Sequence, residues 1–153
     1  MKLHVIFFGV FFLISSCTTN HPTLTEEKKE YFKKIENPLE RWQAHKISNY
    51  NYLIDISLFG SGAGKYRVFI QNSKVEKVLS IKSNKWIIPT YLKNYYTFND
   101  LIIAAQSKDT TQQKIQVKYD SLYGYPIQYF DEGYNEVIDD EYRYEIREVE
   151  FFR

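Results

Sequence analysis

Aromatic and aliphatic residues recur at every second position through much of this chain, and that alternation restricts its fold more than any other feature. The clearest run has Tyr50, Tyr52, Ile54, Ile56 and Leu58 at its apolar positions. A period of two is the pattern of a strand with one buried and one solvated face. The alternation resumes at Tyr66 and at Val75, and Asn72-Ser73 between these two runs suits a tight hairpin turn. Residues 49–81 are therefore predicted to form a three-stranded antiparallel meander.

Two short helices are predicted on either side of that meander. Asn37 can cap a helix whose first position is Pro38, and this N-terminal helix is expected to end near Ser48. Thr97 stands three residues before Asp100, as in a capping box, and an apolar stripe follows it as far as Lys108. This pattern indicates a second helix.

Three more strands are expected over residues 115–119, 125–129 and 142–152, with Pro126 either at a sheet edge or at the start of its strand. The order of helix, three strands, helix and three strands indicates an α+β fold. We expect an antiparallel sheet of about six strands in two three-stranded meanders. The N-terminal helix and the helix between the meanders should pack on one face of it.

The N-terminus has the features of an export signal. Lys2 precedes an apolar run over residues 3–14, which is shorter than the roughly 20 apolar residues that a permanent membrane span needs. The run ends in Ile14-Ser15-Ser16-Cys17, which resembles the bacterial lipobox. In such signals the thiol of the cysteine receives a diacylglyceryl group, and the peptide before it is removed. Cys17 is the only cysteine of the chain, so no internal disulfide is expected.

These features divide the chain of 153 residues into three parts. Residues 1–16 are predicted to be a lipoprotein signal peptide, residues 17–36 a lipidated cysteine with a polar tether that turns helical toward its end, and residues 37–153 a single α+β domain. The lipid would hold the protein at a membrane of the bacterial cell envelope. Thr18 resembles the sorting signal for the outer membrane, with the domain facing the periplasm.

Composition excludes one class of partner. The chain has 20 lysines and arginines against 19 acidic residues, for a net charge of +1, whereas a general nucleic-acid binder shows a basic surplus. His45 is the only histidine of the folded part, so catalytic triads and zinc sites have little support. The glycine-rich stretch 60–64 leads into a strand and not into a helix, so a flexible turn is favoured over a phosphate-binding loop. No cofactor is expected.

Two kinds of site remain open. The acidic stretch 131–141 supplies Asp131, Asn135 and Asp139, whose oxygens suit Ca²⁺, although the spacing differs from that of an EF-hand loop. Aspartate, asparagine and glycine are also ordinary loop residues. The many tyrosines at strand positions are typical of a half-buried sheet, or of a concave face that grips a peptide or a sugar. A pair of carboxylates for glycoside hydrolysis is conceivable, but nothing singles out two of them.

The domain resembles the domain-of-unknown-function family 6174, a family of exported bacterial proteins. The residues that carry the resemblance are Trp42, Tyr50-Asn51-Tyr52, Tyr119, Asp120, Tyr123, Gly124, Tyr125, Pro126, Asp131, Asp139, Tyr142 and Tyr144. The likeness spans roughly residues 39–151 and implies no known reaction. The segment from Tyr119 to Pro126 is either a binding motif or a turn in which Asp120 caps the backbone, Gly124 takes a positive φ and Pro126 fixes the exit.

We therefore predict a lipid-anchored envelope protein that acts as a non-enzymatic module for protein or peptide binding, or for assembly. A calcium- or small-molecule-responsive periplasmic sensor that uses the 131–141 stretch is the alternative, followed by an uncatalogued hydrolase. The expected partners are the membrane, through the lipid, and an envelope protein or peptide; nucleic acid is not expected.

Overall fold

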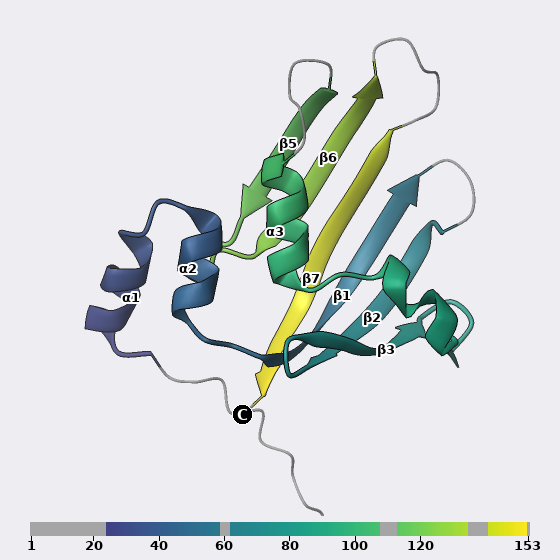
Figure 1. Cartoon of the computed structure of the whole chain (residues 1–153), viewed down its shortest axis with the longest axis horizontal. Coiled ribbons are helices and arrows are strands. Elements are labelled where there is room, and N and C mark those ends of the chain that lie inside the picture. The colour runs from purple at the N-terminus through teal and green to yellow at the C-terminus, as the bar shows by residue number, and fades with distance from the viewer. Residues whose placement is uncertain (1–23, 59–61, 108–112, 135–140, 153) are drawn as a thin grey trace, which may run out of the picture.

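A single antiparallel sheet of seven strands, with helices on one face, forms the centre of the computed structural model (Figure 1). The structure describes residues 24–58, 62–107, 113–134 and 141–152. Its elements are α1 (Glu26–Lys33), α2 (Pro38–Ala44), β1 (Asn49–Leu58), β2 (Gly64–Gln71), β3 (Lys74–Ser80), β4 (Lys85–Trp86), the 3-10 helix η1 (Pro89–Asn94), α3 (Phe98–Ser107), β5 (Gln113–Tyr119), β6 (Pro126–Tyr134) and β7 (Tyr142–Phe152). The predicted α+β class is confirmed.

The strand count corrects the prediction of six. The strands follow the order β4-β3-β2-β1-β7-β6-β5, and the additional strand is β4 at one edge. β4 has only two residues, which pair with Leu79 and Ser80 of β3. Two residues are too few to show an alternating pattern, so the sequence carried no signal for this strand.

The first meander forms as predicted. β1 pairs with β2 and β2 with β3, both antiparallel. Asn72 and Ser73 at the β2–β3 turn have φ values of 51° and 59°, both positive, which matches the twist of a tight hairpin. The second meander joins the first through β1 and β7, where Tyr50 lies opposite Phe151 and Ile56 opposite Tyr144. This pairing makes one continuous sheet from two segments that are far apart in the sequence.

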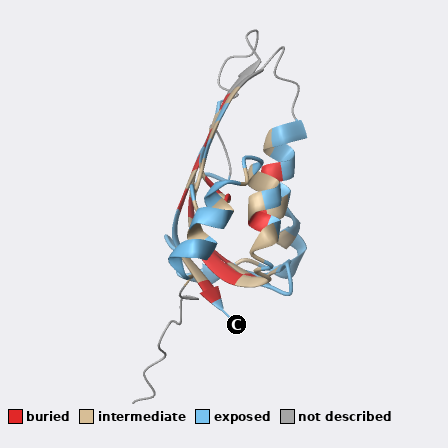
Figure 2. Cartoon of the chain, turned by 90° about the vertical axis from the view of Figure 1, so that its left-hand side faces the viewer, coloured by how far each residue is buried: buried red, intermediate tan, exposed pale blue. Residues whose placement is uncertain are grey.

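The helices cover one face of the sheet and leave the other bare (Figure 2). The Asn37 side chain accepts hydrogen bonds from the backbone N–H groups of Leu39 and Glu40, as the predicted cap requires. Thr97 and Asp100 form the expected capping box, because the Asp100 carboxylate accepts from the backbone and hydroxyl of Thr97 while Asp100 donates its N–H to the Thr97 hydroxyl. No helix within the described part of the chain is long and apolar enough to cross a membrane.

The second meander departs from prediction at its middle strand. β6 continues to Tyr134, so the first residues of the stretch expected as an acidic loop belong to a strand. Pro126 is the first residue of β6, which is one of the two positions expected for it. α1 lies within the segment predicted as a tether with a helical end, and Phe32 of α1 stacks on His45, with 3.7 Å between ring centroids.

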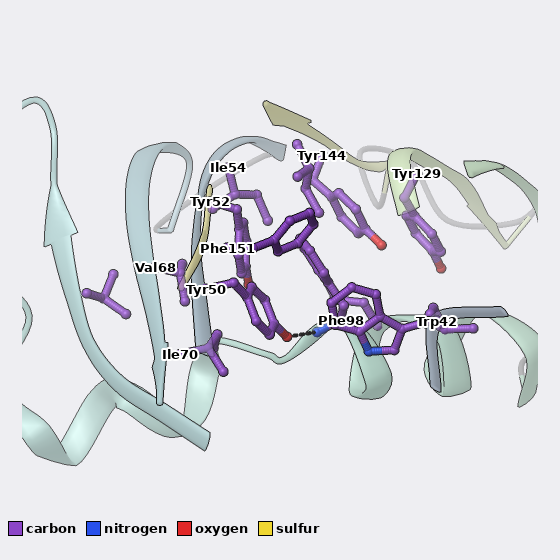
Figure 3. Packing of buried hydrophobic residues seen from close by; sticks show 14 residues of the cluster. Trp42, Tyr50, Tyr52, Ile54, Val68, Ile70, Phe98, Tyr129, Tyr144 and Phe151 are labelled. Atoms are coloured by element: carbon purple, nitrogen blue, oxygen red, sulfur yellow. Dashed lines mark hydrogen bonds between the residues drawn. The ribbon is translucent and has the colours of Figure 1, made fainter. Parts of the chain in front are cut away.

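The core lies between the helices and the sheet and is largely aromatic (Figure 3). Phe98, at the start of α3, is fully buried at its centre. Its ring stacks on Tyr50 and on Tyr125, each at 4.7 Å between centroids, and meets the edge of Trp42 at 5.2 Å. Such aromatic pairs add about 0.5–1.5 kcal/mol each beyond the burial of their area.

Candidate ligand-binding pocket

A pocket of about 410 Å³ lies between α3 and the helix-covered face of the sheet. We call it the tyrosine pocket. Its lining comes from β1, β6, β7, α3, the end of η1 with the two residues that follow, and Gly62 between β1 and β2: Ile56, Leu58, Gly62, Asn94, Tyr95, Tyr96, Leu101, Ala104, Tyr129, Tyr142 and Tyr144. This volume falls within the range of sites that bind small ligands or single side chains of a partner.

The strands place three of these tyrosines together because of their period. Tyr142 and Tyr144 stand two residues apart on β7 and therefore point to the same face of the sheet. Tyr129 of β6 lies directly opposite Tyr144 in the strand register. The rings of Tyr129 and Tyr144 are stacked, with centroids 5.0 Å apart and planes 5° apart, and Tyr142 presents its edge to both. The three rings form one wall of the pocket.

The opposite wall is made by α3. Leu101 and Ala104 stand three positions apart and line the pocket from the same side of the helix. Ala104 is exposed, so its small side chain lies where the pocket opens to solvent. Tyr96, which is 46% exposed, also lines the pocket. The alanine leaves space that a larger residue would fill.

The hydroxyl of Tyr144 distinguishes this pocket from the rest of the core. Tyr144 is 2% exposed, and its Oη has no hydrogen-bond partner within the described structure. Burial, followed by the neighbouring phenols of Tyr142 and Tyr129, raises the pKa of Tyr144 well above its ordinary value. An unpaired buried hydroxyl is destabilising by about 1–3 kcal/mol. A ligand atom that paired with this oxygen would remove that penalty.

Other tyrosines near the pocket have partners. Tyr52 Oη donates to the Tyr96 carbonyl at 2.5 Å, and Tyr129 Oη donates to Asp131 Oδ2 at 3.2 Å. Burial and the adjacent Tyr66 phenol raise the pKa of Tyr95 to about 12. Tyr95 and Tyr144 are therefore neutral at physiological pH. Among its described lining residues the pocket holds no carboxylate, histidine or cysteine, so it offers an apolar surface with neutral hydroxyls.

The sequence motif from Tyr119 to Pro126 lies elsewhere, against α2. Asp120 Oδ1 accepts hydrogen bonds from the N–H groups of Leu122 and Tyr123, at 2.9 and 2.7 Å. Gly124 has φ +84°, and a Cβ at that position would stand 2.5 Å from the carbonyl oxygen of Pro38. Asp120 thus caps the turn and Gly124 takes a positive φ, as the structural interpretation predicts. Gly124 additionally permits the close approach of α2.

Two side chains contact this turn, those of Arg41 in α2 and of His45 directly after α2. Arg41 donates to the carbonyls of Ile35 and Ser121, at 2.8 and 3.0 Å. His45 Nε2 lies 3.0 Å from the Leu122 carbonyl oxygen, and the His45 ring lies 4.6 Å from the ring of Tyr123. Burial lowers the pKa of His45, against the opposing effect of that carbonyl. The motif therefore connects the two helices near the N-terminus to the sheet.

Asn51, also part of the resemblance, is buried on the bare face of the sheet. Its amide donates to Glu150 Oε2 at 2.9 Å and its Oδ1 accepts from Arg67 at 3.0 Å. Arg67 also pairs with Glu148, whose φ is 47° at the irregularity in the β1–β7 pairing. The central residue of the Tyr-Asn-Tyr motif thus has an evident structural role.

The calcium candidates are only partly described. Asp131 is 3% exposed on the helix-covered face, and its carboxylate accepts the hydrogen bond from Tyr129. Asn135 and Asp139 lie outside the described residues, as does Cys17. Within the described ranges, no three histidine, cysteine or acidic residues are grouped so as to hold a metal ion.

The sequence leaves a concave tyrosine face open as an alternative to an ordinary half-buried sheet, and it does not locate such a face. Tyr142 and Tyr144 were recognised as strand residues of the resemblance, and the alternation placed both on one face. The contributions of Ala104 and of the segment 94–96 were missed, because neither carries a motif. Only the packing of α3 over β6 and β7 brings them together.

Comparison with known proteins supports the resemblance to a family. The model of the Family of unknown function (DUF6174) matches residues 22–151, so the match begins inside the predicted tether and includes α1. The chain therefore belongs to this family. No curated protein matches the chain.

Proposed function

We propose that this member of DUF6174 is a lipid-anchored protein of the bacterial cell envelope that binds a protein or peptide partner and catalyses no reaction. The tyrosine pocket is the binding site, and it receives an apolar side chain of the partner. The observation that carries the proposal is a pocket with apolar walls and one buried hydroxyl, that of Tyr144, which has no hydrogen-bond partner among the described residues.

The energetics favour a role in binding. A pocket in the core loses the contacts that a filled core would make, and the unpaired Tyr144 hydroxyl adds about 1–3 kcal/mol of destabilisation. Both penalties disappear when a partner fills the space and pairs with Tyr144 Oη. A tyrosine, leucine or methionine side chain followed by a backbone carbonyl has the required shape and acceptor.

A protein or peptide is favoured over a free metabolite because of the rim. Exposed Tyr96 and Ala104 lie at the border of the pocket, and Ile103, which is 45% exposed, is the neighbour of Ala104 on α3. Aromatic residues around a desolvated pocket are typical of the energetic centres of protein interfaces. Neutral walls also lack the charged groups that would hold an ionic metabolite.

The location rests on Ile14-Ser15-Ser16-Cys17 and on the apolar run before it. The thiol of Cys17 is the site of lipidation, and Thr18 directs the protein to the outer membrane with the domain facing the periplasm. In bacteria fed a labelled fatty acid, the full chain should carry label and sediment with membranes. Cys17→Ser should lose the label; label retained in that variant would exclude this anchor.

Photo-crosslinking in living cells tests the pocket directly. The photoreactive residue p-benzoyl-phenylalanine replaces Ala104 in the full chain, and the control carries it at Gln106, an exposed residue of α3 outside the pocket lining. Illumination should attach an envelope protein at position 104 and not at position 106. Equal capture at both positions, or no capture at position 104, would contradict the proposal.

A steric variant gives an independent check. Ala104→Trp should fill the entrance and abolish the crosslink formed by a second probe at Tyr96, whereas Gln106→Trp should leave it unchanged. Both positions are exposed, so both variants should unfold at urea concentrations near that of the wild type. An unchanged crosslink in Ala104→Trp would show that the partner does not enter the pocket.

A further inference from the structure

One edge of the sheet combines positive charge with exposed apolar side chains. We call residues 74–94, which span β3, β4 and η1, the basic corner. Its lysines are Lys74, Lys77, Lys82, Lys85 and Lys93, all exposed, and its only acidic residue is Glu76. Five lysines against one glutamate give a net charge of +4, whereas the whole chain carries +1. Much of the basic character of the protein is therefore concentrated in this segment.

Large apolar side chains are exposed among these lysines. Trp86 is 55% exposed, Ile88 58% and Tyr91 53%. Trp86 pairs with Leu79 and lies beside Phe69 on the bare face of the sheet, with 5.8 Å between ring centroids, whereas Ile88 and Tyr91 lie at the start of η1 and within it. Exposed tryptophan, isoleucine and tyrosine beside lysine are the residues that proteins place at the boundary between lipid headgroups and acyl chains.

The basic corner is attached firmly to the sheet. The Ile87 N–H donates to the Val78 carbonyl at 2.8 Å, and the Ile81 N–H donates to the Lys65 carbonyl at 2.9 Å. Lys77 Nζ lies 5.1 Å from the ring centroid of Phe69 and 5.2 Å from that of Trp86. Within the described residues, none of the five lysines forms an ion pair, so their charge is available to an external anion.

We propose that the basic corner docks on the surface of an anionic phospholipid bilayer, with Trp86, Ile88 and Tyr91 entering the headgroup region. Each lysine near such a surface raises the affinity about fivefold, and the apolar side chains add the burial of their own area. This inference goes beyond the pocket but rests on the proposed location at a membrane. Such docking would give the tethered domain a fixed orientation relative to the bilayer.

The tether keeps the domain near the bilayer. Six residues separate Cys17 from Leu24, the first described residue, and so short a chain spans at most about 25 Å. A lipid on Cys17 would hold the start of α1 within that distance of the bilayer, and the basic corner, at the opposite end of the long axis from α1 (Figure 1), supplies a second point of contact at a high effective concentration of the surface. A stable attachment commonly combines one lipid signal with a second, basic one.

The two tryptophans of the chain allow a direct test. Trp42 is 5% exposed in the core, whereas Trp86 lies in the basic corner. The full chain is added to vesicles of phosphatidylcholine alone or mixed with phosphatidylglycerol, both with brominated acyl chains that quench tryptophan at short range. Flotation of the vesicles is used to match the amounts of bound chain before emission is read.

Anionic vesicles should quench the emission of Trp86 about twofold and shift it to shorter wavelength, and about 0.5 M salt should reverse this. Neutral vesicles should not. The variant Trp86→Phe, which reports Trp42 alone, should emit equally with both kinds of vesicle. Lys82→Glu combined with Lys85→Glu should lower the affinity for anionic vesicles at least about 25-fold.

Matched substitutions at exposed lysines outside the basic corner, Lys46→Glu with Lys118→Glu, should retain the quenching. Equal quenching by neutral and anionic vesicles, equal loss in both lysine pairs, or no quenching in either vesicle would overturn the proposal. So would a chain that fails to float with anionic vesicles. The vesicles contain no partner protein, so none of these outcomes affects the crosslinking test of the pocket.

Discussion

Two regions on the same face of the sheet use the same residue type in opposite ways. The first, which we call the closed end, surrounds Phe98 and includes Trp42, Tyr50, Tyr125 and Phe151. The second is the tyrosine pocket. Both contain tyrosines that lie between the sheet and the helices, yet rings and hydrogen bonds fill the closed end while the pocket keeps about 410 Å³ of space.

The covering helix accounts for the difference. At the closed end α2 contributes Trp42, whose ring reaches Tyr50 at 5.3 Å and Phe98 at 5.2 Å. Tyr50 Oη accepts the Phe98 N–H at 2.8 Å, as the dashed line in Figure 3 marks. Over the pocket α3 contributes only Leu101 and Ala104. Sheet tyrosines thus support stability where a large ring covers them, and leave a receptive surface where a small residue does.

The strongest test of the comparison places a methyl group at each end. Gly124→Ala should destabilise the protein by about 3–5 kcal/mol, because the new Cβ would stand 2.5 Å from the Pro38 carbonyl oxygen at a φ of +84°. Gly62 has a φ of +112°, but a Cβ at that position would meet only Leu58 Cδ2, at 3.9 Å. Gly62→Ala should therefore lower the free energy of unfolding by about 1–2 kcal/mol. Urea unfolding measures both. Equal losses would show that the closed end is no more tightly packed than the pocket.

Removing a paired hydroxyl should have the next largest effect. Tyr50→Phe leaves the buried Phe98 N–H without its acceptor, and the free energy of unfolding should fall by about 1–3 kcal/mol. The control is Tyr66→Phe, whose hydroxyl makes long contacts of 3.4 and 3.5 Å to backbone carbonyls and also interacts with the phenol of Tyr95. That variant should change stability by less than about 0.5 kcal/mol. A Tyr50→Phe variant as stable as the control would be evidence that the N–H finds another acceptor.

Lowering the pH should destabilise the folded protein through the titration of His45. Burial lowers the pKa of His45 in the folded state, so the unfolded chain takes up its proton first as the pH falls below about 6.5. The stability contributed by neutral His45 is complete above that pH and declines as the pH drops toward the lowered folded pKa. His45→Gln keeps a donor for the Leu122 carbonyl but cannot titrate.

The urea midpoint of the wild type should therefore fall between pH 7.5 and pH 5.5 more than that of His45→Gln. The window avoids Glu30 and Glu145, whose pKa values are lowered by Lys33 and Arg147 and whose contributions are lost only at more acidic pH. Identical pH profiles for the two proteins would mean that His45 does not link the closed end to pH.

At Tyr144 the effect on stability is expected to have the opposite sign. Tyr144→Phe removes a hydroxyl that has no hydrogen-bond partner among the described residues, so the free energy of unfolding should rise by about 1–3 kcal/mol. The same substitution should weaken the crosslink from Ala104. A loss of stability like that of Tyr50→Phe would indicate that the hydroxyl is paired and would remove the main support for the pocket as a site.

Much of the fold was predictable because its signals are local. Asn37 and Thr97 cap their helices with atoms two or three residues away, and Asn72-Ser73 turns the chain with its own φ angles. The alternation in β1 likewise marks a strand without reference to its neighbours. β4 escaped prediction because two residues hold no period. β6 exceeded its predicted length because its pairing with β5 continues to Tyr134, inside the acidic segment.

The sequence indicated which residues could form a site, but not where in the fold they lie. Asp120 and Gly124 were identified as a turn or a binding motif, and their geometry shows a turn held by α2. Asp131 stood out as an oxygen ligand, yet it faces the core beside Tyr129. The residue type shows which interactions a side chain can make. Which of them it makes depends on neighbours that come from other strands.

The sequence by itself determined six of the seven strands, the β2–β3 turn, the helix caps and the family, because each depends on residues that are near one another in the chain. The tertiary structure alone decided that β1 lies beside β7 and that Ala104 leaves an opening. It also decided that, among the described residues, the hydroxyl of Tyr50 has a hydrogen-bond partner while that of Tyr144 has none. A cavity is the space that remains after distant segments pack. It therefore depends on the sizes and positions of all of them together, and no single stretch of sequence contains that information.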